Sequence, residues 1–218
     1  MSRTLVDRGD ARQRLIEAAL RVFGEHGFSG ASTRAIAAEA GANIAAIPYY
    51  FGGKEGLYLA VADHIADQIT GRIGPIFATA QVDHDPTPEE ARRLLLGIAD
   101  GFISMMIGSE DSALWARIIV REQFDPTEAF DILYDRVMGP YYVAIGRLLG
   151  VIFRKPHESD EIKLKVFALI GQALIFRIAR AAINRRMGWQ KLTEERLGQI
   201  RTVVLSHLAA IIDEGAAS

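Results

Sequence analysis

The apolar positions of this chain recur three and four residues apart along most of its length, with polar residues between them. Spacing of this kind places apolar side chains on one face of an α-helix, because a helix turns about once every 3.6 residues. No segment has the apolar-polar alternation of a strand, the turn residues of a hairpin or an internal repeat. The pattern therefore predicts an all-α protein.

The N-terminal part of the pattern predicts three helices, at residues 10–26, at residues 32–40 and over a short stretch that begins after Asn43. Ser32 and Asn43 have side chains that accept hydrogen bonds from the first free amides of a helix. Gly41 can adopt the left-handed conformation that a turn between two helices requires. Two short helices joined by such a turn are typical of a helix-turn-helix.

A fourth helix is predicted from Lys54, and Gly71, Gly74 and Pro75 are expected to bend or end it. Further helices are predicted, with connections of ordinary length, at residues 88–107, 112–122, 127–153, 159–187 and 193–214. We expect two domains: a helix-turn-helix domain over residues 1–53, and a C-terminal helical bundle for ligand binding and dimerisation over residues 54–218. The fourth helix would link them.

The third helix has two contrasting faces. Ile44, Ile47 and Phe51 share one face of a helix that begins after Asn43, and we expect them to pack on the second helix. The opposite face carries Asn43, Ala45, Ala46, Pro48 and Tyr49. Small outward residues allow close approach to a major groove about 12 Å wide, and alanine methyl groups can contact thymine methyl groups. The missing amide hydrogen of Pro48 is expected to distort or end the helix near Ile47.

Side chains suited to phosphate groups surround this face. Tyr49 and Tyr50 have hydroxyl groups that can bind phosphates, and Lys54 adds a positive charge at the start of the fourth helix. Thr33 and Arg34, at the start of the second helix, are expected to contribute further contacts. Residues 32–54 are therefore predicted to bind double-stranded DNA.

The stretch STRAIAAEAGANIAAIPYYFGGKEGL resembles the N-terminal signature of the TetR family of transcriptional regulators, and the resemblance extends over residues 12–59. Asn43 stands where the family usually has serine, and Pro48 where it usually has a phosphate-binding tyrosine that Tyr49 could replace. The matching positions are Ser32, Ile36, Ala37, Ala40, Gly41, Ile47, Tyr50, Phe51, Lys54, Glu55 and Leu57. The resemblance implies a homodimeric repressor that a small-molecule effector releases from a palindromic operator.

Residues 121–141 and 174–189 look like the CecR-like subgroup of this family, whose members are associated with the control of drug-efflux and drug-sensitivity genes. A transcriptional activator of the same architecture remains an alternative. A second alternative is a helical carrier or enzyme with a vestigial helix-turn-helix, which would bind a ligand tightly and have no affinity for DNA.

Two C-terminal helices are candidates for the dimer interface, because one is apolar around most of its circumference and the other has a matching stripe. The alternative is that both helices lie in the core of the monomer. The predicted interface residues are Leu164, Phe167, Ile170, Leu174, Leu197, Ile200, Val204 and Leu208.

A ligand site is predicted from aromatic residues and methionines, which form adaptable apolar walls. Arg177 is included because a guanidinium group on an apolar helix needs a carboxylate, a helix end, a ligand or solvent. The alternative is that these side chains form ordinary core. The candidates are Phe102, Met105, Met106, Trp115, Tyr134, Phe176 and Arg177.

The composition limits other kinds of chemistry. The 218 residues have a net charge of −2 and include no cysteine, so disulfides, cysteine-zinc sites and thiol catalysis are excluded, and a cytoplasmic location is expected. No catalytic motif, cofactor motif or complete set of metal ligands is visible. The segments 63–67 and 83–85 each bring together two aspartates and a histidine, which we interpret as solvated residues. The apolar run 166–176 is too short to cross a membrane.

Overall fold

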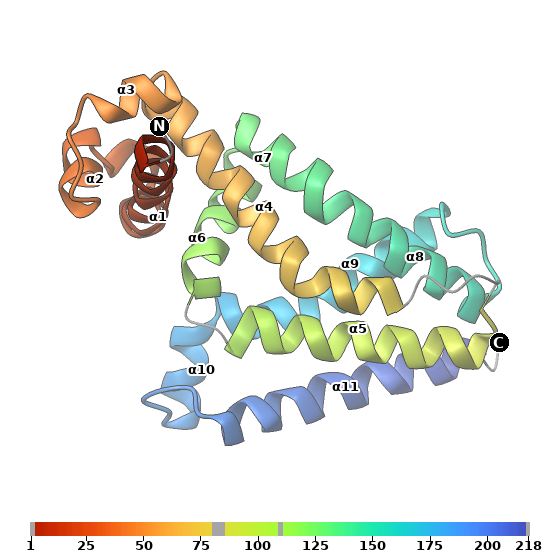
Figure 1. The fold of residues 1–218 in the computed structure, drawn as a ribbon. Coiled ribbons are helices and arrows are strands. Elements are labelled where there is room, and N and C mark those ends of the chain that lie inside the picture. Colours follow the sequence, from red (N-terminus) through yellow and green to blue (C-terminus); the bar gives the residue numbers. More distant parts are fainter. Residues whose placement is uncertain (1–2, 80–85, 109–110, 217–218) are drawn as a thin grey trace. The chain divides into compact units, whose positions relative to one another are not determined.

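The structure is a computed structural model that describes residues 3–79, 86–108 and 111–216. Within these ranges the chain forms helices joined by turns and contains no strand, so the predicted all-α fold is confirmed (Figure 1). The elements are α1 (Arg3–Gly30), α2 (Thr33–Glu39), α3 (Ala46–Phe51), α4 (Lys54–Thr79), α5 (Pro88–Gly108), α6 (Asp111–Phe124), α7 (Glu128–Leu133), the π-helix η1 (Tyr134–Met138), α8 (Gly139–Phe153), α9 (Asp160–Ile178), α10 (Arg180–Met187) and α11 (Glu194–Ala216).

The first helix starts earlier than predicted, and the fourth ends later. Gly27 has φ 73° and ψ 173°, which is non-helical, so α1 consists of two helical segments that meet at a kink there, next to the predicted end at residue 26. In α4 the helix continues past Pro75 to Thr79. Its last turns are held by packing, because Phe77 stacks on Tyr141 with ring centroids 4.2 Å apart. Pro75 therefore does not end this helix, and that part of the prediction is wrong.

Two helices that were predicted to be continuous are interrupted. The segment 127–153 contains the π-helix η1 before Pro140, which follows at the start of α8. Proline has no amide hydrogen, so a regular helix would leave the carbonyl four residues earlier without its donor. The segment 159–187 breaks at Ala179, where φ is −89° and ψ is 23°, and the two parts differ in direction by 68°.

The chain forms two compact units, and it passes between them after Gln68, Ala113 and Val137. Unit 1 comprises residues 1–68 and 114–137, and unit 2 comprises residues 69–113 and 138–218. Unit 1 thus contains α6 and α7 residues as well as the N-terminal helices. The predicted division after residue 53 refers to functional domains and stays a prediction.

The core of unit 1 joins the N-terminal helices to the first half of α4. Its largest fully buried side chains are Leu15, Phe23, Ile36, Ile47, Leu57, Ile65, Trp115, Ile118 and Leu133. The ring of Tyr58 packs edge-on against Phe23, with centroids 5.0 Å apart, and against Phe28, with centroids 5.1 Å apart. These ring contacts therefore join α1 to α4 inside unit 1.

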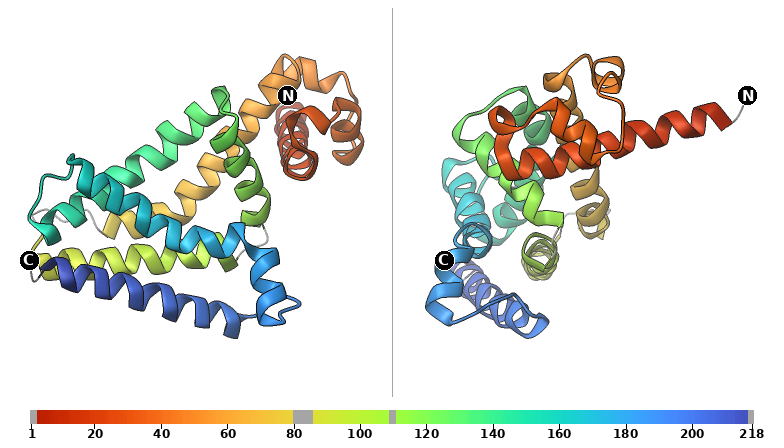
Figure 2. Two further views of the ribbon diagram at one scale, coloured as in Figure 1. Left: turned by 180° about the vertical axis from the view of Figure 1, so that it is seen from behind. Right: turned by 90° about the vertical axis from the view of Figure 1, so that its left-hand side faces the viewer.

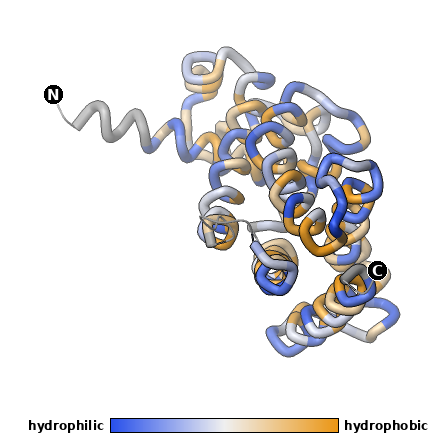
Figure 3. Tube along the Cα trace, turned by 90° about the vertical axis from the view of Figure 1, so that its right-hand side faces the viewer, coloured by the Kyte–Doolittle hydropathy of each residue, from blue (hydrophilic) through white to orange (hydrophobic). Residues whose placement is uncertain are grey.

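The core of unit 2 lies between α5, α8, α9 and α11, and α5 and α11 run side by side, as the left view of Figure 2 shows. Figure 3 shows apolar positions interspersed with hydrophilic ones along the helices of the chain, as expected for amphipathic helices. At Gly101 the helix α5 comes so close to α4 that a Cβ atom would lie 2.2 Å from Ile76 Cδ1. A side chain at this position would therefore require the end of the Ile76 side chain to move.

No single helix of the described ranges has the length and hydropathy to cross a membrane. The bent pair α9 and α10 meets the two criteria together, on length and composition alone.

Candidate nucleic-acid interface

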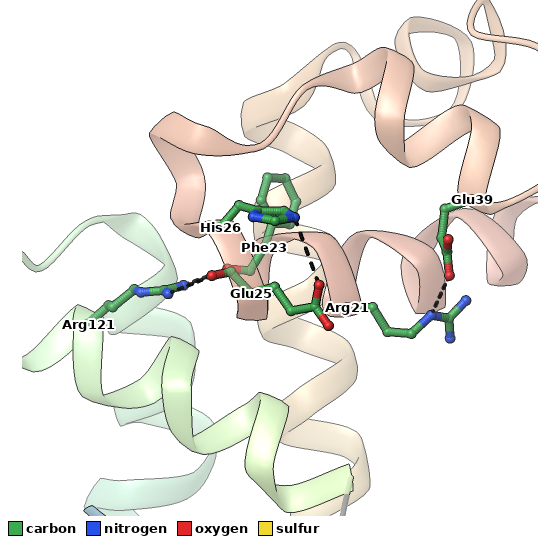
Figure 4. A network of polar contacts seen from close by, with 6 residues as sticks. All are labelled: Arg21, Phe23, Glu25, His26, Glu39 and Arg121. Atoms are coloured by element: carbon green, nitrogen blue, oxygen red, sulfur yellow. Dashed lines mark hydrogen bonds and ion pairs between the residues drawn. The ribbon is translucent and has the colours of Figure 1, made fainter.

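The second helix begins as the sequence predicts. The side chain of Ser32 accepts a hydrogen bond of 3.1 Å from the amide of Ala35, which satisfies one of the free amides of the first turn. The other end of α2 is joined to α1, because Arg21 Nε donates to Glu39 Oε1 over 2.9 Å (Figure 4). Both side chains are about half exposed, so this ion pair orients α2 and adds little to stability.

The turn before α3 differs from the prediction. Asn43 Oδ1 accepts from the amide of Ala45 over 2.9 Å, as a capping residue does, but Asn43 precedes a turn and the regular helix begins only at Ala46. The carbonyls of Asn43 and Ile44 accept from the amides of Ala46 and Ile47, three residues on, at 2.9 and 3.2 Å. A tight turn therefore leads into the helix.

Pro48 does not end the third helix. It lies in the first turn of α3, where an amide hydrogen would have no partner within the helix, so its absence costs nothing there. The helix continues to Phe51 and stops at Gly52, whose φ of 75° is left-handed. The prediction that the helix distorts or ends near Ile47 is wrong about its end, because it assumed a helix that begins directly after Asn43.

The same shift changes which residues face inward. Ile47 is fully buried and Phe51 is partly buried, as predicted. Ile44 is 46 % exposed, so the prediction that it packs on α2 is wrong. The reason is geometric: Ile44 precedes the helix, and the helical spacing that relates Ile47 to Phe51 does not apply to it.

The residues predicted to contact DNA lie in or next to this turn and helix. Tyr49 is 69 % exposed, and its ring packs edge-on against Tyr50 with centroids 4.9 Å apart. Tyr50 is only partly exposed. Of the remaining members, the exposed ones are Arg34, Asn43, Ala45 and Pro48, and the partly exposed ones are Thr33, Ala46 and Lys54.

Two cations next to the site lie over aromatic rings. Lys54 Nζ is 4.5 Å from the centroid of the Phe28 ring, and Arg12 Cζ is 5.3 Å from that of Phe51. A cation over a ring face is attracted by the ring quadrupole while it keeps access to solvent. Lys54 is therefore held in place and remains able to meet an anion.

A buried polar network inside unit 1 supports the interface, and sequence reasoning missed it. Glu122, which is 3 % exposed, accepts from the hydroxyl of Tyr58 over 2.8 Å and from the amide and hydroxyl of Thr127, both over 2.9 Å. Burial raises the pKa of Tyr58 above its ordinary value, and the neighbouring Glu122 raises it further. The network links α4 to the junction of α6 and α7.

Arg121 makes a second link inside unit 1. Its guanidinium group donates to the carbonyl of Phe23 over 2.5 Å and to that of Glu25 over 3.4 Å, just before the kink of α1 (Figure 4). A cation at this position adds hydrogen bonds to backbone carbonyl groups next to the kink. Nothing in the sequence near residue 121 indicated these partners, since they lie almost one hundred positions away.

The predicted ligand residues are divided between the two units. Trp115 and Tyr134 belong to unit 1, where Trp115 is buried and Tyr134 is 43 % exposed. In unit 2 Met105 and Met106 are buried, and Phe102, Phe176 and Arg177 are partly buried.

Arg177 has polar contacts at the end of α5. It donates to the hydroxyl of the buried Ser112 over 3.0 Å, and Ser112 donates to the carbonyl of Met106 over 3.1 Å. The guanidinium group is therefore connected to the C-terminal end of α5, one of the partners expected for it.

The predicted dimer residues fall into two groups. The residues on α9 are exposed or partly exposed, with Leu164 at 69 % and Phe167 at 55 %, while Ile170 and Leu174 are partly buried. The residues on α11 are buried within the chain itself: Leu197, Ile200, Val204 and Leu208. These four therefore form core, as the alternative interpretation held, and assigning them to a dimer surface was wrong.

Asp63 and Asp67 have a structural partner. Arg136 donates to Asp63 Oδ1 over 2.7 Å and to Asp67 Oδ1 over 2.6 Å. Across the described part of the chain, no group of three histidine, aspartate or glutamate residues is arranged to hold a metal ion. The segment 83–85 lies outside the described residues.

The short capped helix, the turn and the exposed face of α3 define a helix-turn-helix of the kind that binds DNA. The chain belongs to the TetR family of transcriptional regulators. Residues 15–61 match the family described as "Bacterial regulatory proteins, tetR family", and residues 91–215 match "HTH-type transcriptional dual regulator CecR, C-terminal domain". The family consists of regulators and not of enzymes, which agrees with the prediction.

Individual relatives support the same assignment. CecR of Shigella flexneri is 38 % identical over 205 residues, which cover 93 % of this chain and 91 % of that protein. The regulatory protein RaaS of Mycobacterium tuberculosis is 43 % identical over 163 residues, which cover 74 % of this chain and 68 % of RaaS. The solved structure of AibR with isovaleryl coenzyme A and operator DNA has a TM-score of 0.66 at 15 % identity, over 90 % of this chain and 97 % of AibR, which is a likeness of fold.

Proposed function

We propose that this chain is a dimeric, ligand-responsive regulator that binds a palindromic operator through α3 and the turn before it. The observation that carries the proposal is the exposed face made by Asn43, Ala45, Pro48 and Tyr49, with Arg34 and Lys54 beside it. A face of small and aromatic residues with cations at its edge fits a groove whose walls are phosphates.

The contacts divide into two kinds. Thr33, Arg34, Tyr49, Tyr50 and Lys54 bind phosphate oxygens and supply most of the affinity, which is therefore strongly dependent on salt. The smaller residues Ala45, Ala46 and Pro48 enter the major groove, while Asn43 holds the turn through its bond to Ala45. Tyr49 takes the place of the family's phosphate-binding tyrosine, since Pro48 occupies that position.

The dimer uses the exposed side of α9. The exposed residues in the first turn of α9 are charged (Asp160, Glu161 and Lys163), but from Leu164 onwards the exposed residues recur along one side of the helix and are apolar: Leu164, Phe167, Ala168, Gly171, Ile175 and Ile178. Contiguous exposed apolar surface of this kind marks an interface more often than a solvated face. Pairing α9 with the same helix of a second subunit about a two-fold axis places two copies of the helix-turn-helix, the reading heads, in one dimer. A palindromic operator requires these two heads about 34–36 Å apart.

The effector acts through unit 2. A ligand among Phe102, Met105, Met106, Phe176 and Arg177 favours an arrangement in which α4 has swung, and the two heads then no longer fit one operator. The continuity of α4 from unit 1 into unit 2 supports this route. The regulator works in the cytoplasm and represses its target genes, which include genes for drug efflux or drug sensitivity. Activation stays a second outcome, because the relative CecR is named a dual regulator.

Operator selection and Lys54→Gln test the proposal. The full-length protein is used to select DNA from a genomic library, and binding is measured by electrophoretic shift across a range of salt. We expect a palindromic site, with affinity that falls as salt rises. Lys54→Gln weakens binding to every sequence and lowers the salt slope by about one. Tight binding of a small molecule without selection of any DNA would instead favour the carrier alternative.

Spin labels test the switch separately. Labels on α4 of both subunits report the distance between the heads in the operator-bound and effector-bound dimers. Equal distances in the two forms would contradict a mechanism based on head separation.

A further inference from the structure

Ile44 is an aliphatic side chain in an unexpected place. It is 46 % exposed, whereas the other large aliphatic residues between Leu15 and Ile65 are buried or partly buried. A single exposed aliphatic residue is common on protein surfaces and has no meaning alone. Ile44 differs because it lies between Asn43 and Ala45, on the face that we assign to the major groove.

The backbone at Ile44 is held on both sides. Its carbonyl accepts from the amide of Ile47 over 3.2 Å, and the side chain of Asn43 accepts from the amide of Ala45 over 2.9 Å. A β-branched side chain also has few rotamers. The backbone at Ile44 is therefore held in place, and the branch at Cβ limits the directions in which the methyl groups point, as a specificity contact requires.

The chemistry around Ile44 excludes most other base contacts. No charged residue lies between Glu39 and Lys54, so this stretch has no arginine or lysine for the acceptor atoms of guanine. The amide oxygen of Asn43 is already used by the cap. Thymine offers the one major-groove feature that an aliphatic side chain reads, its C5 methyl group.

We infer that Ile44 is a specificity-determining residue that contacts the methyl group of a thymine in each operator half-site. The inference rests on the proposed DNA-binding face and goes beyond it, because it assigns a base feature to a residue expected in the core. The neighbouring Ala45 and Pro48 complete an apolar surface around the methyl group.

Replacing thymine by deoxyuridine tests the inference, because the change removes one methyl group and leaves base pairing intact. The selected operator is scanned by making this replacement at each symmetric pair of thymines. Wild-type protein is expected to lose affinity at one such pair, by about fourfold for each methyl group or about tenfold or more for the pair. Ile44→Ala is expected to bind the two operators equally.

Two variants serve as comparisons. Lys54→Gln, altered at a phosphate contact, is expected to bind more weakly overall and to keep the full response to deoxyuridine. Ile44→Val, which removes one methyl group, is expected to keep part of the response to deoxyuridine. If circular dichroism shows that Ile44→Ala is unfolded, Ile44→Val is used in its place.

The outcomes separate the inference from the proposed function. Operator binding that does not respond to deoxyuridine at any position overturns the inference alone. A response of equal size in wild type and Ile44→Ala overturns it as well. Failure to select any DNA overturns the proposed function and this inference together.

Discussion

Glu122 shows how one residue can join several segments of unit 1, which contains the helix-turn-helix. Its carboxylate is almost fully buried and binds a tyrosine hydroxyl, a backbone amide and a threonine hydroxyl at once. A buried carboxylate is costly unless its oxygen atoms are satisfied, and here each of them has at least one donor. The network therefore favours one arrangement of α4 relative to the α6–α7 junction within unit 1.

Replacing Glu122 by glutamine should destabilise unit 1. The amide keeps the shape of the side chain, but it places an NH₂ group opposite donors and removes the charge that strengthens the bonds. We expect a loss of roughly 1–3 kcal/mol in the free energy of unfolding, measured by urea denaturation. The exposed Glu128 provides the control, since Glu128→Gln should change stability by less than about 0.5 kcal/mol. Equal effects of the two changes would contradict the role of the network.

The raised pKa of Tyr58 predicts sensitivity to alkaline pH. The folded state holds the phenol proton more tightly than the unfolded state, so the stabilisation is complete below the ordinary pKa of 10.0 and is lost as pH rises above it. Wild-type protein should therefore lose stability as pH rises above about 10, and Tyr58→Phe should lose less over that range. Urea denaturation at several pH values measures the difference. Parallel curves for the two proteins would show that Tyr58 is not the group concerned.

At the scale of single elements, the third helix shows both what sequence could predict and where it failed. The buried Ile47 and the cap at Ser32 follow from spacing and residue type, and both were predicted. The start of α3 was not, because Asn43 caps a turn and a helix by the same type of hydrogen bond. The error of two residues also misplaced Pro48 and Ile44.

Interactions between distant segments could not be predicted at all. Arg121 and Glu122 lie in a helix whose pattern indicates only amphipathicity, and their partners near residues 23, 58 and 127 are selected by the fold. The apolar stripe of α11 was predicted, but periodicity does not distinguish a face that packs inside a subunit from one that meets a second copy. The predicted dimer residues on α11 were wrong for this reason.

Gly52 and Gly71 offer a matched pair at this scale. Gly52 ends α3 with a φ of 75°, whereas Gly71 lies within α4, and an added Cβ atom would meet nothing within 4 Å at either position. Gly52→Ala should destabilise the protein by about 1–2 kcal/mol through backbone strain. Gly71→Ala should stabilise it by about 0.5–1 kcal/mol through helix propensity. Thermal and urea unfolding measure both, and the same sign for the two changes would contradict this account.

At the scale of the whole molecule, the proposed dimer depends on the exposed face of α9. Phe167→Glu places a charge on this face at a position that is 55 % exposed, so the subunit itself should fold normally. We expect a monomer by light scattering, and a loss of at least tenfold in operator affinity, because two linked heads bind far more tightly than one. Phe124→Glu is the control, since Phe124 is 80 % exposed in unit 1. A dimeric Phe167→Glu protein would place the interface elsewhere.

The composition of unit 1 has a practical consequence for engineering. Because α6 and α7 residues belong to the same unit as the N-terminal helices, an N-terminal fragment cut after Gln68 would lose the partners of Tyr58 and of the α1 kink. A chimera that grafts only this fragment onto the sensor of another regulator would carry an unpaired phenol and a bare aromatic surface. Transplanting residues 1–68 and 114–137 together keeps the partners of Tyr58 and of the kink in α1. The graft of both segments should therefore be more soluble than the graft of residues 1–68 alone.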